Sequence, residues 1–247
     1  MTTETIKPIS LIIVVHQEAE SIEHVVKEFY EKVTSKIPGS EFIVCEDGST
    51  DGTKEILSKI KDAYHLTLDM REGKRGYTNA MRDGLRAAKN PVIFFSDSDG
   101  QHDPEDFWKM YESLLDYDMV VGWKKGRNDA FYRLVLTGVF NRIIGWYFGV
   151  KLHDTNCGFR LMNRKVVDFL LRQDWLLQYC NNAELTVKAV RGGFRVTEIP
   201  VSHFQRRYGV SRGLPIKKLP KIIIHILRNF PKIKYLRKDQ ISCHVEK

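Results

Sequence analysis

Three side chains that could supply oxygen ligands follow one another closely near the middle of the sequence. Asp97 and Asp99 are separated by one residue, and Gln101 comes two positions later. In an extended chain this spacing places both carboxylates on the same side. Hard oxygen ligands of this kind suit Mg²⁺ or Mn²⁺, with phosphate oxygens completing the coordination shell. The spacing therefore indicates a divalent metal site that takes a phosphorylated ligand, and no adjacent Cys or His pair suggests zinc.

An ordinary turn is the alternative interpretation of an isolated Asp-x-Asp, because Asp, Ser and Gly are the usual turn residues. The flanking sequence favours the metal site. Residues 92–95 form a short apolar run without polar alternation, as expected for a strand covered on both faces. Ligands of open α/β sheets bind at the carboxyl ends of such strands. Pro104 then predicts the start of a helix, with Asp103 as its N-cap.

A second loop, residues 46–53, places further carboxylates after a predicted strand. Asp47 is expected to contact a ligand, whereas Asp51 is expected to cap the helix that begins near Thr53. Gly48 and Gly52 fit neither a P-loop nor a G-x-G-x-x-G pattern. The loop therefore indicates ligand binding mainly through Asp47.

The elements that would position these loops alternate between strands and helices. Apolar β-rich runs predict strands, and periodic apolar residues predict helices. Strands are expected at residues 9–15, 41–45, 64–69, 92–95, 119–123 and 194–200, and helices at residues 22–35, 53–61, 78–89, 107–115, 131–147, 165–172 and 181–191. This order predicts an α/β fold with a mostly parallel sheet.

Basic segments lie between and after these elements. The loops at residues 71–77, which include Gly76, and at residues 203–212 carry cations that could bind phosphate, although a solvated turn explains the first of them equally well. The expected helix at 131–147 is unusually apolar and could belong to the core or touch a membrane. Residues 214–238 interleave apolar and basic side chains, which fits a helix packed on the domain and a segment on an anionic membrane equally well.

The composition limits the class of protein. A chain of 247 residues, 43% hydrophobic and 28% charged, is one large domain or two small ones with a sizeable core. Its formal net charge of +8 favours anionic partners, but no motif or aromatic platform for nucleic acid accompanies that charge. Four scattered cysteines predict reduced thiols of an intracellular protein. We expect neither a signal peptide nor a membrane span, because no apolar run approaches about 20 residues.

Three motifs together resemble those of a known family. Residues 46–53 read E-D-G-S-T-D-G-T, residues 97–105 read D-S-D-G-Q-H-D-P-E, and residues 154–160 read D-T-N-C-G-F-R, followed by R-Y-G-V-S-R at 207–212. In this order and spacing the chain resembles the family 2 glycosyltransferases of the GT-A fold, over roughly residues 9–213. Within them it is similar to the dolichol-phosphate mannose synthase and polyprenyl-phosphate glycosyltransferase branch.

The resemblance implies a fold and a reaction. The fold would be a single GT-A (Rossmann-like) domain over residues 1–213, with a basic amphipathic helical tail over residues 214–247. The reaction would move a hexose, with inversion, from GDP-mannose or a UDP-sugar to a dolichyl or undecaprenyl phosphate at the cytoplasmic membrane face, with Mg²⁺ or Mn²⁺ as cofactor. The protein would bind this membrane face peripherally. A membrane-spanning partner would be compatible with this location, and no nucleic acid partner is expected. The alternatives are a saccharide acceptor in cell-surface polysaccharide synthesis and a non-catalytic scaffold that binds nucleotide sugars.

The resemblance also implies roles for single residues. Asp47 would contact the base, Asp97 the ribose or the metal, and Asp99 and Gln101 the metal that bridges the diphosphate. The cations expected to bind phosphates are Arg133, Arg207, Arg212 and Lys124. The further substrate-binding candidates are Glu18, Gly76, Ser98, Asp154, Arg160, Glu184 and Ser211. Asp154 and Glu184 are also candidates for a general base, which a sugar hydroxyl acceptor would need.

Two positions depart from the family pattern. Residues 14–18 read V-V-H-Q-E where the family has P-x-Y-N-E, so only Glu18 is shared. Lys124 stands where the family has an arginine after the fifth strand, which replaces a forked donor by a point charge. These departures concern base recognition and phosphate binding.

Overall fold

The computed structural model describes residues 6–125, 131–206 and 219–234, apart from the side chains of Phe131 and Arg133. Its strands are β1 (Ile9–Val15), β2 (Glu41–Glu46), β3 (Leu66–Met70), β4 (Val92–Asp97), β5 (Met119–Lys124), β6 (Arg160–Asn163) and β7 (Val196–Val201). They form one sheet in the order β3-β2-β1-β4-β6-β5-β7. β6 runs antiparallel to both of its neighbours, whereas every other pairing is parallel. The predicted α/β fold with a mostly parallel sheet is confirmed.

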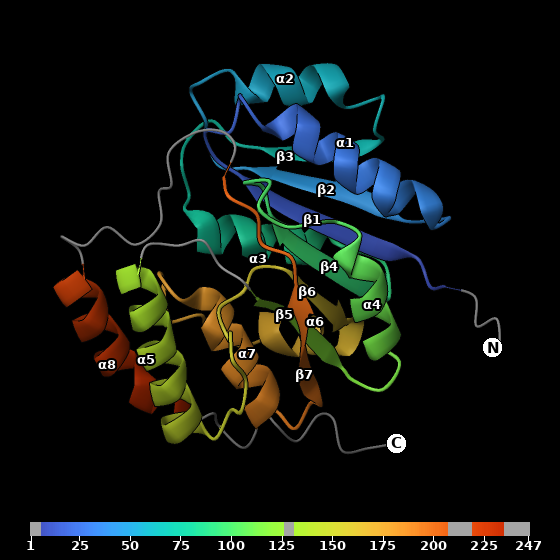
Figure 1. Cartoon of the computed structure of the whole chain (residues 1–247). Helices are drawn as coiled ribbons and strands as arrows, with labels where there is room; N and C mark the ends of the chain where they lie inside the picture. The colour runs from blue at the N-terminus through green and yellow to red at the C-terminus, as the bar shows by residue number, and fades with distance from the viewer. Residues whose placement is uncertain (1–5, 126–130, 207–218, 235–247) are drawn as a thin grey trace.

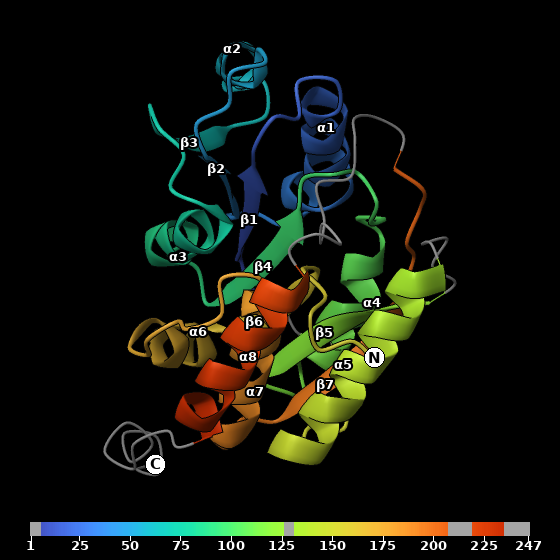
Figure 2. The same cartoon turned by 90° about the vertical axis from the view of Figure 1, so that its left-hand side faces the viewer.

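Helices cover both faces of this sheet (Figures 1 and 2). The described helices are α1 (Ile22–Lys32), α2 (Thr53–Ile60), α3 (Tyr77–Ala87), α4 (Asp106–Ser113), α5 (Phe131–Phe148), α6 (Arg164–Leu171), α7 (Asn181–Arg191) and α8 (Leu219–Lys234), with a short 3₁₀ turn, η1 (Thr34–Lys36). Figure 2 shows α3 and α6 on one face and α1 and α4 on the other. All seven residues of β1 are buried, which is why all of them except Ser10 are apolar.

β6 is the strand that the sequence pattern did not predict. It has only four residues, none of them β-branched, and α6 begins directly after it. Long-range pairs fix its place instead: Leu161 lies between Phe94 of β4 and Val120 of β5. Because β6 is antiparallel, the residues that precede it lie at the sheet edge where β4 and β5 end. The loop that enters β6 can therefore join a site formed by loops that leave the other strands.

Two predicted helix caps are wrong. α4 begins at Asp106 with Glu105 as its N-cap, and Asp103 Oδ1 instead accepts the Glu105 N–H at 3.1 Å. α2 begins with Gly52 as its N-cap, and Asp51 Oδ1 accepts the Thr53 N–H at 3.2 Å. Each aspartate therefore bonds the amide two residues ahead of it, as in an Asx turn, and stabilises the turn that precedes the helix.

α5, α7 and α8 form a second, smaller apolar cluster beside the main core. The ring of Phe230 in α8 lies 4.9 Å from the ring of Phe148 and 5.6 Å from that of Tyr147, both in α5. Figure 1 shows α5 and α8 side by side at one end of the molecule. Other side chains of both helices are exposed: Trp146 of α5 is 85% exposed and Ile224 of α8 is 49% exposed. Residues 219–234 therefore pack one apolar face on the domain, and the contact of the tail with a membrane stays a prediction.

No helix in the described part of the chain combines the length and the apolar character that crossing a bilayer requires.

Candidate active site at the carboxyl ends of the strands

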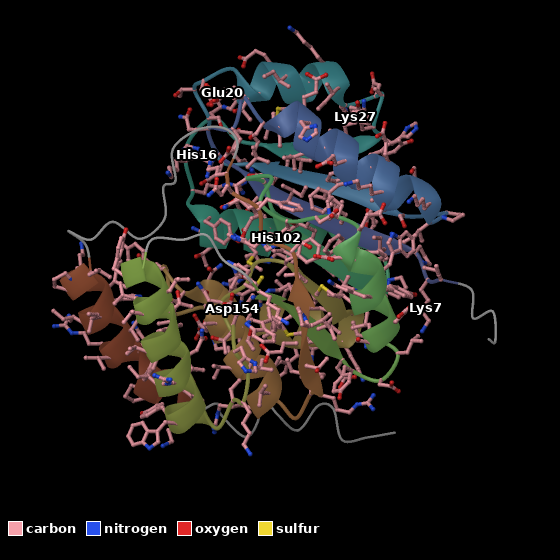
Figure 3. The ribbon with its side chains drawn as sticks, viewed as in Figure 1. Lys7, His16, Glu20, Lys27, His102 and Asp154 are labelled. Carbon is pink, nitrogen blue, oxygen red and sulfur yellow. The ribbon has the colours of Figure 1, made fainter. Side chains whose placement is uncertain are left out.

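Three loops meet where the strand order reverses, between β1 and β4. Val14 near the end of β1 pairs with Asp97 of β4, and Val15 pairs with Glu46 of β2. The loops after these three strands therefore leave the sheet at one edge. In open α/β sheets, the crevice at this point is where ligands bind. Figure 3 shows His102 and Asp154 near the middle of the view and Lys7 at its right-hand edge.

Asp97 is held from two sides at the end of β4. Its Oδ1 accepts the hydroxyl hydrogen of Tyr77 at 2.7 Å. On the other side lies the backbone of Gly158, so close that a Cβ at this position would lie 2.3 Å from Asp97 Oδ2. Only glycine fits such a close approach, which explains this residue in the loop before β6. Burial and Asp97 together raise the pKa of Tyr77 well above its usual value, so the hydroxyl stays protonated and donates.

The Asp99 carboxyl has an unusual affinity for protons. Burial, and then the neighbouring Asp97 carboxylate, raise the pKa of Asp99 to about 6, while Arg206 and Lys124 act in the opposite direction. Asp99 Oδ1 accepts the Gln101 N–H at 3.1 Å, and the Gln101 side chain donates through Nε2 to the Phe204 carbonyl at 2.9 Å. A cation bound between the carboxylates would remove their mutual repulsion. Asp97, Asp99 and the amide oxygen of Gln101 are the hard donors that Mg²⁺ and Mn²⁺ take, so these residues fit a divalent ion.

The described ranges contain no group of three His, Cys, Asp or Glu side chains that could enclose a metal. Mg²⁺ in proteins is commonly held by one or two carboxylates together with water and phosphate oxygens, so an ion at Asp97 and Asp99 would need further ligands such as Gln101, water or a phosphate group.

The raised pKa of Asp99 predicts how the stability of the metal-free protein depends on pH. A carboxyl whose folded pKa is about 6, against a reference value of 3.8, takes up its proton more readily in the folded chain than in the unfolded one. Its contribution to the free energy of unfolding is therefore complete below about pH 4 and is lost as the pH rises through about 6. Urea unfolding at pH 5 and pH 7.5, in a chelating buffer, should show wild type losing stability relative to Asp99→Asn. Equal pH dependence in the two proteins would contradict the raised pKa.

The loop at 71–76 is bound to Asp47 through its backbone. Asp47 is buried, and its Oδ1 accepts the N–H of Arg75 at 2.7 Å, while Oδ2 accepts the N–H of Gly76 at 3.0 Å. The approach is close on the other side as well, because a Cβ at Gly48 would lie 2.6 Å from the Lys74 backbone nitrogen. The structure therefore brings the predicted residues Asp47 and Gly76 together, and Asp47 shapes the basic loop. Arg75 in turn pairs with Asp69 and Asp83.

Arg206 is a site residue that the sequence did not single out. Its guanidinium pairs with the Glu18 carboxylate in the loop after β1, and Glu18 Oε2 also accepts the Ser21 hydroxyl at 3.0 Å. The chain just before Arg206 is bound to the Asp99 loop, since the Phe204 N–H donates to the Gln101 carbonyl at 2.7 Å. A segment about 100 residues away in sequence thus crosses the loop at residues 97–101. This contact carries no local sequence signal, because it depends on long-range pairing.

A groove opens between α5 and α8. Its volume is about 300 Å³, and most of its wall is apolar: Leu136, Val139, Phe140, Ile143, Leu219, Ile222, Ile223, Ile226, Leu227 and Phe230. The polar side chains at the wall include Lys124, Asp154 and Asn156. The positive charge of Lys124, at this end of the groove, acts to lower the pKa of Asp99. The arrangement fits a ligand with an apolar chain and an anionic end.

Two predicted substrate-binding residues are turned inward. Arg160 is fully buried, and its guanidinium donates to the carbonyl of Asn182 at 3.0 Å and to that of Cys157. Glu184 is buried as well: it accepts the N–H of Leu176 at 2.8 Å and pairs with Lys188 at 2.5 Å. Both side chains therefore have internal partners and position the surrounding backbone, and their contacts with a substrate stay predictions. Their charges suggested a binding role, but their burial could not be deduced from the sequence.

Glu184→Gln should reveal this internal role. The substitution leaves the buried Lys188 ammonium without its counter-charge and one backbone N–H without a good acceptor. We expect the free energy of unfolding to fall by about 2 kcal/mol, as is common for a broken buried polar pair. Chemical denaturation measures this loss. If stability is unchanged and turnover with a sugar hydroxyl acceptor disappears, Glu184 is a general base after all.

Two further predicted residues are buried. Ser98 lies between Asp97 and Asp99 in the sequence, and Asp154 Oδ1 accepts the Asn156 N–H at 3.3 Å. Arg133 belongs to α5, but its side chain is outside the described part of the chain, as are Arg207, Ser211 and Arg212 altogether. Their proposed contacts with phosphate stay predictions.

Comparison with known proteins places the chain in context. Residues 10–171 match glycosyl transferase family 2. The dodecaprenyl-phosphate galacturonate synthase of Rhizobium johnstonii is 30% identical over 224 residues, which cover 89% of this chain and 65% of the relative. The chain thus spans somewhat less than two thirds of that relative's length. The polyprenol monophosphomannose synthase of Mycolicibacterium smegmatis is 28% identical over 215 residues, which cover 82% of this chain and 79% of the relative.

Among solved structures, the glucosyl-3-phosphoglycerate synthase from Mycobacterium tuberculosis in complex with Mn²⁺, UDP and phosphoglyceric acid is similar in fold. It superimposes with a TM-score of 0.68 at 18% identity, covering 91% of this chain and 78% of that one. At this identity the likeness concerns the fold alone, and it agrees with the expected GT-A architecture.

Proposed function

Because the chain belongs to glycosyl transferase family 2, we propose that it transfers a hexose, with inversion, from a nucleotide sugar to a polyprenyl phosphate. The observation that carries the choice of acceptor is the groove between α5 and α8, whose apolar wall leads to Lys124, Asp154 and Asn156. A polyprenyl phosphate has the matching chemistry, with an isoprenoid chain for the wall and a phosphate for Lys124. The names of the two relatives support this choice, since one is a synthase of dodecaprenyl-phosphate galacturonate and the other of polyprenol monophosphomannose.

The donor would lie over the carboxyl ends of β1, β2 and β4. Asp47 holds the loop at 71–76, and this loop and Asp47 would border the base. Asp97, Asp99 and Gln101 would hold a divalent ion, which would neutralise the leaving diphosphate as a Lewis acid. Lys124 adjoins both this loop and the groove, so its charge would lie between the donor phosphates and the acceptor phosphate. Catalysis would then rest on positioning and on electrostatic stabilisation of the departing phosphate.

No general base is required for such an acceptor. A phosphate monoester is ionised near pH 7 and can attack directly, so in-line displacement would invert the anomeric carbon. Asp154 is the better candidate for a base if the acceptor is a sugar hydroxyl, because it lines the groove whereas Glu184 is held by internal partners.

The outward faces of α5 and α8 suit a membrane surface. Leu134, Val135, Trp146 and Ile224 are exposed and do not line the groove, and neither helix contains an Asp or a Glu. Exposed apolar side chains interspersed with Lys and Arg are typical of helices that lie in the interface of an anionic bilayer. We therefore propose that these helices place the groove against the cytoplasmic face of a membrane, where the lipid acceptor would enter it.

The test offers labelled GDP-mannose and a set of labelled UDP-sugars, one at a time, with Mg²⁺ or Mn²⁺ and a short polyprenyl phosphate. Label that moves into the organic phase measures transfer to lipid. Metal-dependent transfer from one donor is the expected result, and it names the sugar, about which the two relatives differ. Donor hydrolysis without lipid product would point to a saccharide acceptor. Nucleotide binding without any turnover would point to a non-catalytic scaffold.

A further inference from the structure

A tyrosine hydroxyl joins the metal-binding carboxylates to a helix on the acceptor side. Tyr77, the first residue of α3, donates to Asp97 Oδ1 at 2.7 Å, and the side chain of Asn182 in α7 donates to the same hydroxyl at 3.3 Å. The Tyr77 ring is fixed edge-on against Phe95 of β4, with 6.2 Å between centroids and 88° between planes. The Tyr77 side chain is thus oriented by two other elements, β4 and α7.

The first turn of α7 also holds the loop that lines the groove. The Ala183 N–H donates to Asn156 Oδ1 at 3.1 Å, and the Thr186 hydroxyl donates to the Thr155 carbonyl at 2.9 Å. Arg160, at the end of this loop, donates to the Asn182 carbonyl at 3.0 Å. Any shift of this turn of α7 therefore moves the loop that carries Asn156.

The same loop touches Asp97 from the opposite side. Gly158 lies directly against the Asp97 carboxylate, while Asn156 of the same loop lines the groove. Asp97 is thus enclosed by a ring of contacts that runs through Tyr77, Asn182 and the loop at 154–160 and returns at Gly158. An ion that binds the Asp97 carboxylate would therefore act on its hydrogen bond with Tyr77 and on its contact with Gly158.

We infer that Tyr77 and Asn182 are positioning residues that orient Asp97 for the metal–nucleotide complex and couple its binding to binding of the anionic acceptor. The coupling rests on the proposed function, whereas the orientation of Asp97 does not depend on which acceptor is used. A residue that orients a metal ligand commonly affects metal affinity by about 10- to 100-fold.

The first arm of the test measures Mn²⁺ affinity by electron paramagnetic resonance, with saturating UDP and then GDP, so that no turnover is involved. Tyr77→Phe should weaken Mn²⁺ binding about tenfold. Asn182→Ala should act in the same direction, and the double variant should be no weaker than the worse single variant, because both act through one chain of hydrogen bonds. Tyr111→Phe is the matched control, since the Tyr111 hydroxyl accepts the Lys7 N–H at the other side of the molecule.

Unchanged Mn²⁺ affinity in folded Tyr77→Phe would overturn the positioning role, and so would additive losses in the double variant. Thermal unfolding verifies that each variant is folded. If Tyr77→Phe is not, Asn182→Ala alone decides the question, because its side chain meets Asp97 only through the tyrosine.

The second arm measures binding of a short polyprenyl phosphate in detergent, with and without Mn²⁺ and the nucleoside diphosphate. Wild type should bind the lipid phosphate more tightly when both are present. In Tyr77→Phe the ratio of the affinities with and without Mn²⁺ and the nucleoside diphosphate should fall most of the way to one. An equal ratio in the two proteins would overturn the coupling. If wild type binds no lipid phosphate under any condition, the proposed acceptor and the coupling are both wrong, whereas the role of Tyr77 toward Asp97 is still decided by Mn²⁺ affinity.

Discussion

Asp99→Ala is expected to abolish metal-dependent sugar transfer while the chain stays folded. The substitution removes one of two neighbouring carboxylates and leaves Asp97 and Gln101 too few to hold a divalent ion under a diphosphate. The loss of turnover should be at least about 10³-fold, because the metal provides most of the charge stabilisation of the leaving group. The fold should persist, since the Asp99 carboxyl follows the last strand residue of β4 and its ionised form is disfavoured there.

Asp103→Ala is the matched control for this prediction. Asp103 lies four residues further along the same loop, and its carboxylate is occupied by Lys32 at 3.4 Å and by the Glu105 N–H. Turnover is measured with saturating donor over a range of Mg²⁺ concentrations, and folding by thermal unfolding. Full activity in folded Asp99→Ala would mean that the metal site lies elsewhere or that the reaction does not use one.

Ile223→Asp is expected to raise the KM for a polyprenyl phosphate on the order of 100-fold. Ile223 lines the groove between α5 and α8 and is 50% exposed, so the new carboxylate would contact the isoprenoid chain and repel its phosphate. Bringing a charge against an apolar ligand costs several kcal/mol, and about 2.7 kcal/mol corresponds to a factor of 100. The KM for the nucleotide sugar should be unchanged, because the donor is expected on the other side of Lys124.

Ile224→Asp separates the groove from the outer surface of α8. Ile224 is the next residue and is 49% exposed, but it does not line the groove. In detergent, with a short-chain acceptor, Ile224→Asp should therefore resemble wild type. If both variants raise the KM equally, the apolar acceptor contacts the exposed face of α8 and not the groove. If neither variant does, the groove does not bind the acceptor.

The sequence was sufficient for the parts of the site that follow regular strands. Residues 92–95 of β4 are apolar, and Ser96 and Asp97 follow them, so both the strand and the position of Asp97 at its end follow from local residue types. The same holds for Asp47 after β2. It does not hold for β6, whose four residues have no β-branched side chain and become a strand only because β4 and β5 lie on either side. Tertiary pairing decides such a short segment, and no window of sequence contains that information.

Charge was the least reliable guide to function. Arg160 and Glu184 carry charges that suggested substrate contact, yet both are buried with internal partners. Conversely, Tyr77 and Arg206 lie in the basic loops at 71–77 and 203–212 but were not named individually, and the fold places them against Asp97 and Glu18. A charged or polar residue acquires its role from the partners that surround it. For Tyr77 and Arg206 those partners are 20 and 188 residues away in the sequence.

The antiparallel direction of β6 makes part of this chain a module. β5 ends at Lys124 and β6 begins at Arg160, and the two strands are paired, with Val121 opposite Arg160. The intervening chain, with α5 and the loop at 154–159, therefore leaves the sheet and returns to it at one edge. Such an insertion could be exchanged between relatives without changing any strand of the sheet. Because it contributes one wall of the groove together with Asp154 and Asn156, a chimera made at these two borders would exchange much of the acceptor specificity and leave the donor loops in place.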